Sequence, residues 1–166
     1  MHSRRSLLLS SASLAGIAAC CAIVPALAAT ADAASRGKTI HSDAEWKTLL
    51  SPDQYEVLRQ AGTERPFTSA LLDEHRSGTF GCAGCDLPLF SSRTKFDSGT
   101  GWPSFWQPLD GAVTQARDES FGMVRNAVSC GRCDGHLGHV FEDGPAPTGL
   151  RYCINGVALT FVAAAA

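Results

Sequence analysis

The sequence predicts a mainly β domain preceded by short helices. Between Gly78 and Val162, glycines, short apolar runs and turn residues recur, and no helical periodicity lasts long. Helix-start signals stand before this region, at Ser42 and at Ser51. The length of 166 residues suits one domain with a small additional segment.

The additional segment is residues 1–28, which resemble a secretory signal of the twin-arginine type. Arg4 and Arg5 precede an apolar run from Leu7 to about Ala19, and Ala26-Leu27-Ala28 has the pattern of a cleavage site. The run is too short to span a bilayer comfortably. We therefore expect the twin-arginine export machinery as a partner and a periplasmic or otherwise exported location.

A second processing route stays open. Ile17-Ala18-Ala19-Cys20 resembles a lipoprotein cleavage box, which would leave the protein lipid-anchored through Cys20. Residues 29–40 read as a flexible lead, and 41–166 as the domain. Removing 28 residues with two arginines and no acids leaves 138 residues with a net charge of −4. No long basic run follows, so nucleic acid is not an expected partner.

Two short helices are predicted at the start of the domain. Ser42-Asp43-Ala44-Glu45 is a capping box, and the helix should run to about Leu50 with Trp46, Leu49 and Leu50 on one side. A second helix should begin at Ser51-Pro52 and end at Gly62. We expect both to pack on the core.

The cysteines divide into a metal-site pattern and one thiol left over. Of seven, two lie in the signal, and four form the pairs Cys82-Ala83-Gly84-Cys85 and Cys130-Gly131-Arg132-Cys133, where glycines permit tight turns. Two such knuckles predict one structural Zn²⁺ held by four thiolates. The rival interpretation is disulfides or a redox pair, which export to an oxidising compartment would favour. Folding before twin-arginine export would protect the thiolates.

The remaining thiol, Cys153, lies in a predicted strand. Alternation puts Arg151, Cys153 and Asn155 on one face, and the positive charge should favour the nucleophilic thiolate. The simpler alternative is a small buried cysteine on an ordinary strand. His136 and His139 follow the second knuckle, and we assign them to Cys153 because four thiolates already fill a tetrahedron.

An aromatic loop, Phe96–Trp106, is flanked by glycines and contains two tryptophans. Its rings could line an apolar pocket. For Phe96, Phe105 and Trp106, core packing is the favoured interpretation.

Taken together, these motifs resemble the methionine-R-sulfoxide reductases. The matching segments run from about Trp46 to Phe161: Gly62–Phe67, both knuckles, Ser98–Phe105, Gly135–Phe141 and Arg151–Asn155. The resemblance implies two antiparallel sheets, with zinc distant from the active site. It implies Cys153 as nucleophile, Trp102 as the wall for the S-methyl group, and Phe141 as a further substrate contact. His136 and His139 would contact the sulfoxide oxygen or its water, with His139 as proton donor, while Asn155 and Arg151 orient the thiolate.

The implied reaction is attack of the Cys153 thiolate on the sulfoxide, which leaves methionine and a sulfenic acid. The substrates would be oxidised proteins or peptides, or free methionine sulfoxide. Many family members carry a resolving cysteine where this chain has Thr100. A threonine cannot form a disulfide, so we expect an external reductant, either a thioredoxin-like protein or a small thiol.

Two other functions stay open on the residues alone. A zinc-stabilised binding module would explain the knuckles but not the set around Cys153. A cysteine-histidine-asparagine hydrolase or acyl transferase would use the same residue types.

Overall fold

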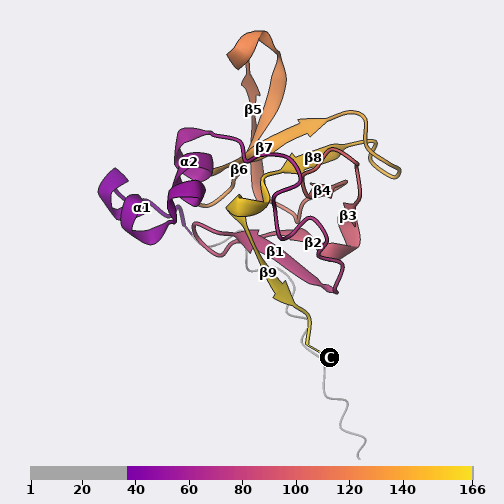
Figure 1. The fold of residues 1–166 in the computed structure, drawn as a ribbon, viewed down its shortest axis with the longest axis horizontal. Coiled ribbons are helices and arrows are strands. Elements are labelled where there is room, and N and C mark those ends of the chain that lie inside the picture. Colours follow the sequence, from indigo (N-terminus) through magenta and orange to yellow (C-terminus); the bar gives the residue numbers. More distant parts are fainter. Residues whose placement is uncertain (1–36, 166) are drawn as a thin grey trace, which may run out of the picture. The chain divides into compact units, whose positions relative to one another are not determined.

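The computed structural model describes residues 37–165, apart from the side chain of Phe121. It contains a three-stranded sheet in the order β2-β1-β9 and a six-stranded sheet in the order β3-β4-β8-β7-β6-β5, with antiparallel pairing throughout (Figure 1). The strands are β1 Gly78–Cys82, β2 Pro88–Ser91, β3 Lys95–Phe96, β4 Ser104–Phe105, β5 Val113–Asp118, β6 Arg125–Cys130, β7 His136–Phe141, β8 Arg151–Ile154 and β9 Leu159–Ala163. The predicted mainly β fold of two antiparallel sheets with short N-terminal helices is confirmed.

The signal predicted for 1–28, Cys20 and residues 29–36 of the predicted lead lie outside the described residues. Residues 37–40 make contacts with the second knuckle: the Thr39 N–H donates to the Arg132 carbonyl at 3.0 Å, and Lys38 pairs with Asp134. Within the described part of the chain, no helix is both long enough and apolar enough to cross a membrane.

Both helices begin as their capping signals predict. Helix α1, Asp43–Leu49, and helix α2, Pro52–Gln60, each start with a complete capping box, formed by Ser42 with Glu45 and by Ser51 with Gln54. Two details of the prediction are wrong. Leu49 is 59% exposed, because it lies on the solvent side of α1 while Trp46 and Leu50 are buried. Helix α2 ends at Gln60 and is capped by Ala61, which adopts a left-handed conformation (φ 54°), so the helix does not continue to the predicted end at Gly62.

The core lies between the two sheets and is rich in aromatic rings. Phe105 of β4 is fully buried; its ring stacks on Phe90 with centroids 4.4 Å apart and meets Phe80 edge-on at 5.0 Å. The predicted core role therefore holds for Phe105, whereas Phe96 and Trp106 are only half-buried. On β8, Tyr152 and Ile154 point into this core.

Because side chains alternate along a strand, the neighbours of Tyr152 face the other way. Arg151 and Cys153 are half-buried on the opposite face of the six-stranded sheet. The register pairs Cys153 with Ser104 on β4 and with His139 on β7, and pairs Arg151 with Phe141. These residues therefore share one face of the sheet, away from the aromatic core.

A bulge in β7 brings both histidines to that face. In a regular strand, residues three apart point to opposite sides. Here Val128 pairs with Gly138 but Ser129 pairs with His136, so β7 contains one extra residue at Leu137. The bulge lets Leu137 and Val140 both enter the core, and it places His136 beside His139.

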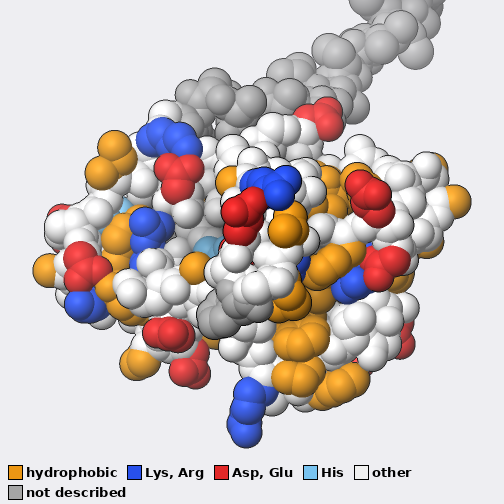
Figure 2. Space-filling view, turned by 90° about the horizontal axis from the view of Figure 1, so that it is seen from above, with side chains coloured by type: hydrophobic (Ala, Val, Ile, Leu, Met, Phe, Trp, Pro, Cys, Tyr) orange, Lys and Arg blue, Asp and Glu red, His pale blue; other side chains and the backbone are white. Residues whose placement is uncertain are grey.

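Charged side chains of both signs are mixed with apolar ones on the face drawn in Figure 2. No large area of a single charge is visible on this face.

Candidate active site and metal centre

Cys153 lies in the middle of the six-stranded sheet, where neighbouring strands fix its position on both sides. Its Sγ is 3.9 Å from the Thr100 hydroxyl. Burial raises the pKa of the Cys153 thiol, while Thr100 and Arg151 act in the opposite direction. The charge of Arg151 therefore favours the thiolate as expected, but desolvation outweighs it.

Arg151 is held firmly next to the thiol. Its guanidinium forms two hydrogen bonds of 2.8 Å with the Asp143 carboxylate and lies over the Phe141 ring, 4.4 Å from the centroid. Hydrogen bonding between the two charged groups lowers the pKa of Asp143 and raises that of Arg151. Phe141 thus supports the arginine from β7, a contact that strand pairing predicts only once the register is known.

The two histidines differ in environment. Their ring centroids are 5.3 Å apart, and His136 is 8% exposed with a buried Nε2 that has no hydrogen-bond partner. Burial, aided by His139, lowers the pKa of His136 to about 4, so this ring is neutral at physiological pH. A buried nitrogen without a protein partner usually binds a polar atom, such as that of an ordered water molecule.

His139 is oriented by an acid that the sequence did not reveal. Its Nε2 lies 2.8 Å from Oδ2 of Asp118, the last residue of β5, and Arg125 binds the same oxygen at 2.8 Å. Hydrogen bonds from Ser120, and then the bond to His139, lower the pKa of Asp118, so it is ionised. A carboxylate at Nε2 requires the proton there and leaves Nδ1 as the acceptor when the ring is neutral.

Trp102 is half-buried, and its position is fixed by the segment 63–67. The indole N–H donates to the Glu64 carbonyl at 3.1 Å, and the Phe67 N–H donates to the Gly101 carbonyl at 2.8 Å. Gly101 has a φ of 90°, and a Cβ there would lie 2.8 Å from side-chain atoms of Pro66 and Phe67. Glycine is therefore required at this position.

Asn155 is 3% exposed and joins three segments of the chain. Its Nδ2 donates to the Leu137 carbonyl at 2.9 Å, and its Oδ1 accepts from the Glu64 N–H at 2.9 Å. The Glu64 carboxylate in turn accepts from the backbone N–H groups of Gly156 and Val157. Burial raises the pKa of Glu64 despite these bonds. The geometry thus gives Asn155 a positioning role toward the segment that carries the Trp102 contact.

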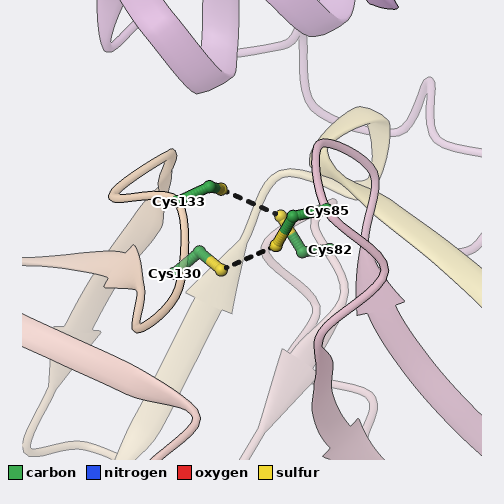
Figure 3. Close-up of side chains that lie close together, drawn as sticks. All are labelled: Cys82, Cys85, Cys130 and Cys133. Carbon is green, nitrogen blue, oxygen red and sulfur yellow. Dashed lines mark hydrogen bonds between the residues drawn. The ribbon is translucent and has the colours of Figure 1, made fainter. Parts of the chain in front are cut away.

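The four knuckle cysteines form a second, separate cluster. Their sulfur atoms all lie within 4.8 Å of one another, with Cys82–Cys133 at 3.6 Å and Cys85–Cys130 at 3.5 Å (Figure 3). A tetrahedral ion with metal–sulfur distances of about 2.3 Å needs sulfur–sulfur edges of about 3.8 Å, so the set fits a closed metal site. The contacts are too long for disulfides, and every cysteine within 37–165 is a free thiol.

The turns of the two knuckles are built alike, but not by their glycines. The residues in the left-handed conformation are Asp86 and Asp134, each directly after the second cysteine of its pair. Aspartate tolerates this conformation better than most residues. Gly131 is needed instead for a close approach, because a Cβ there would lie 2.8 Å from the Gly111 carbonyl.

The N-terminal helices cover this cluster. Arg59 of α2 donates to the Cys133 carbonyl, and Arg132 donates to the Cys85 carbonyl, both at 2.9 Å. Trp46 and Leu58 border Gly84 of the first knuckle, since a Cβ at Gly84 would lie 3.6 Å from side-chain atoms of both. The helices therefore shield the metal site, and the predicted packing role is confirmed for their buried residues.

A cavity of about 690 Å³ lies elsewhere, between α2, residues 63–71 and the turn after Asn155. Its lining contains neither Cys153 nor the histidines. The chemistry is concentrated on the sheet face around Cys153, which is therefore the candidate active site.

Comparison with known proteins shows which family this chain resembles. Residues 50–163 match the family model described as the SelR domain. The chain is 61% identical over 118 residues to "Peptide methionine sulfoxide reductase MsrB" of Pseudomonas putida (strain W619), covering 70% of this chain and 89% of that protein. It is 56% identical over 125 residues to the protein of that name from Agrobacterium fabrum (75% and 93% covered), and 57% identical over 121 residues to that from Leptospira interrogans (72% and 92%).

The match includes Trp102, both knuckles, both histidines and the strand with Cys153, and it extends over most of the described residues. A family model that spans 50–163 of 166 residues leaves little of the domain outside it. The chain belongs to the SelR domain family.

Proposed function

We propose that this chain is a peptide methionine sulfoxide reductase that reduces the R epimer by attack of Cys153 on the sulfoxide sulfur. The observation that carries the proposal is the sheet face on which Cys153 lies opposite His139 and beside Thr100 and Arg151. Relatives that are 56–61% identical are named for this activity. The family resemblance supplies the epimer.

In the first step the Cys153 sulfur bonds to the sulfoxide sulfur, and the sulfur–oxygen bond of the substrate breaks. The oxygen transfers to the Cys153 sulfur as the sulfur–sulfur bond breaks, so methionine leaves and Cys153 becomes a sulfenic acid. The protons balance within the pair, since the thiol proton ends on the sulfenic oxygen. His139, which Asp118 orients, is the proposed carrier of this proton, and neutral His136 is the proposed hydrogen-bond partner of the oxygen.

Trp102 is the proposed wall for the S-methyl group. Its indole N–H is engaged with Glu64, so the ring is fixed without using its exposed surface. An apolar wall on one side and polar nitrogens on the other would favour a single arrangement of methyl and oxygen around sulfur. This is the basis on which the site would select one epimer.

The sulfenic acid requires an external thiol. Within 37–165, the thiols are Cys153 and the four of the metal cluster, so the described domain has no resolving cysteine. We propose that a thioredoxin-like protein or a small thiol attacks the sulfenic sulfur, releasing water and forming a mixed disulfide. A second thiol then restores Cys153 and leaves as a disulfide.

Zinc is the proposed occupant of the cysteine cluster, because four thiolates in a closed tetrahedral set suit Zn²⁺. We assign it a structural role: it would clamp the β1–β2 and β6–β7 turns together. No step of the reaction passes through it.

Export is a separate proposal that rests on residues 1–28. Arg4 and Arg5 followed by an apolar run support the twin-arginine machinery as partner and repair of exported proteins as the setting. Whether the processed protein is soluble or anchored through Cys20 is decided by mass analysis of the mature N-terminus. Arg4→Lys combined with Arg5→Lys should retain the protein in the cytoplasm; unchanged export would contradict the proposal.

The hydrolase alternative loses support from Asn155. Both polar atoms of its amide are engaged, by Leu137 and by Glu64, so it is not placed to orient a histidine. The binding-module alternative leaves the ordered set around Cys153 without a purpose. We therefore carry forward only the reductase.

A single-turnover assay tests the proposal. The reduced chain is mixed, without added thiol, with a peptide that contains either the R or the S sulfoxide, and Cys153 is analysed by mass. We expect methionine from the R form only, with one added oxygen on Cys153. Methionine with a loss of two protons would mean that an internal disulfide forms. No methionine from either form would overturn the proposed activity.

A further inference from the structure

Three hydroxyl groups connect Cys153 to the backbone of Trp102. Thr100 Oγ1 lies 3.9 Å from Cys153 Sγ and 2.8 Å from Ser98 Oγ, which is 2.7 Å from Ser104 Oγ. Ser104 Oγ is 3.1 Å from the Trp102 carbonyl oxygen. Ser104 is fully buried, and Ser98 and Thr100 are half-buried. This series of hydrogen bonds thus runs from the proposed nucleophile to the backbone of the proposed substrate wall.

The direction of this chain follows from counting hydrogens. A carbonyl can only accept, so Ser104 must donate to Trp102. A hydroxyl has one hydrogen, so Ser98 must then donate to Ser104, and Thr100 to Ser98. Thr100 has no hydrogen left for the sulfur, and the last bond forms only if the Cys153 thiol donates to Thr100. All four bonds coexist only with Cys153 protonated.

We propose that Ser104, Ser98 and Thr100 form a directed hydrogen-bond chain that holds Cys153 as a thiol, and that forming the thiolate reverses the chain. With the thiol proton gone, Thr100 donates to sulfur, Ser98 to Thr100, and Ser104 to Ser98. The bond from Ser104 to the Trp102 carbonyl is then lost. No atom is gained or lost in the reversal; the three hydroxyls only rotate.

The chain thereby links the charge of Cys153 to the backbone that carries Trp102. In the resting state the sulfur is kept as the less reactive thiol, which also oxidises less readily. A substrate seated on Trp102 that compensates the freed carbonyl, directly or through water, would favour the reversed chain and the thiolate. Ser98 and Ser104 are positioning residues here, because they act on Cys153 only through Thr100.

A directed chain predicts that removing one of its serine hydroxyls makes the Cys153 thiolate easier to form. If the hydroxyls only donated toward sulfur, removing one would disfavour the thiolate. In a directed chain, Ser98→Ala frees the Thr100 hydrogen for sulfur while Ser104 keeps its bond to Trp102, so the thiolate becomes easier to form. Ser104→Ala has the same effect, because no carbonyl then fixes the direction.

The measurement is the rate of alkylation of Cys153 by iodoacetamide between pH 6 and 10, read from the mass of its peptide in the reduced, zinc-loaded full chain. We expect the pH midpoint of the alkylation rate to fall by about half a unit to one unit in Ser98→Ala and Ser104→Ala. In these variants, forming the thiolate no longer costs one hydrogen bond of the hydroxyl chain. Thr100→Ser keeps the hydroxyl and should behave as the wild type. Ser77→Ala, an exposed serine beside β1, is the matched control.

The charged and titratable groups around Cys153 stay the same in these variants, so they do not account for a shift: Arg151, Asp143, His136, His139, Asp118 and Arg125. A midpoint that rises or does not move in both serine variants would overturn the directed chain. If Ser104→Ala lowers the thermal stability, Ser98→Ala alone decides. The role of the three hydroxyls rests on the proposed function. Alkylation nevertheless reports on the Cys153 thiol even if the protein reduces no sulfoxide, so the hydrogen-bond chain and the reductase activity can fail separately.

Discussion

Replacing Asn155 by alanine removes two side-chain hydrogen bonds, one that joins the end of β8 to Leu137 of β7 and one that joins it to Glu64, which holds Trp102. The Leu137 carbonyl loses little, because it also accepts the backbone N–H of Asn155 at 2.8 Å. The Glu64 N–H, half-buried, loses its acceptor. A lost neutral bond costs about 1 kcal/mol and a buried unpaired group about 1–3 kcal/mol, so we expect Asn155→Ala to lower the free energy of unfolding by about 2–3 kcal/mol.

The same change should affect catalysis through Trp102 rather than through the thiol. Glu64 holds the indole N–H by its carbonyl, so a displaced Glu64 loosens the proposed methyl wall. We expect kcat/KM for the R sulfoxide to fall by about tenfold or more, while the pH profile of Cys153 alkylation stays that of the wild type. Urea unfolding, steady-state kinetics and alkylation together make the test, with Asn126→Ala on the exposed face of β6 as control.

A charged isostere sharpens the test. In Asn155→Asp, the carboxylate would face the Leu137 carbonyl in a buried position, which raises its folded-state pKa above about 3.9. Its ionisation is then favoured in the unfolded chain, so the variant should approach wild-type stability near pH 4 and lose stability as the pH rises. If Asn155→Ala instead lost less than about 0.5 kcal/mol and shifted the alkylation profile, Asn155 would act on sulfur directly and this reasoning would be wrong.

Three further predictions follow from the same geometry. Cys85→Ser should lose the bound metal and the cooperative unfolding transition, read by metal analysis and denaturant titration, because the closed site holds two distant turns together. Burial lowers the pKa of His136 to about 4 in the folded state, against about 6.5 in the unfolded chain, so the free energy of unfolding should decline as the pH falls from 6.5 to 4. His136→Gln should remove about 3 kcal/mol of that decline. The same dependence of stability on pH in the variant and the wild type would refute a neutral, buried His136. Trp102→Phe keeps the apolar wall but loses the bond to Glu64, so kcat/KM should fall only about three- to tenfold, whereas Trp102→Ala should cost about a hundredfold; equal losses would contradict a wall role.

The elements with strong local signals were predictable from the sequence. Both capping boxes are set by a serine and the residue three positions later, and the knuckle spacing alone brings each pair of thiols together. The alternation of Arg151, Tyr152 and Cys153 correctly separated the core face of β8 from its other face. These features depend on residues only a few positions apart.

Contacts that depend on how distant strands and turns pair could not be predicted from the sequence. Asp118 lies on a hairpin 21 residues before His139, and nothing in its local pattern distinguishes it from other surface acids. Glu64 was part of a matched motif, but its bonds to Gly156 and Val157 depend on a turn more than 90 residues away. Alternation placed Asn155 on the face of Cys153, but alternation stops applying where β8 ends at Ile154.

The bulge in β7 explains why a three-residue spacing of histidines suits this site. With regular pairing, His136 would point into the core when His139 faces Cys153, and Leu137 would point out of it. The extra residue reverses the first half of the strand, so two apolar residues enter the core and two imidazoles face the thiol. Gly138 makes this possible, since a Cβ there would lie 2.1 Å from the Cys153 carbonyl oxygen. One close backbone approach therefore sets both the packing of β7 on β8 and the position of the proposed proton carrier.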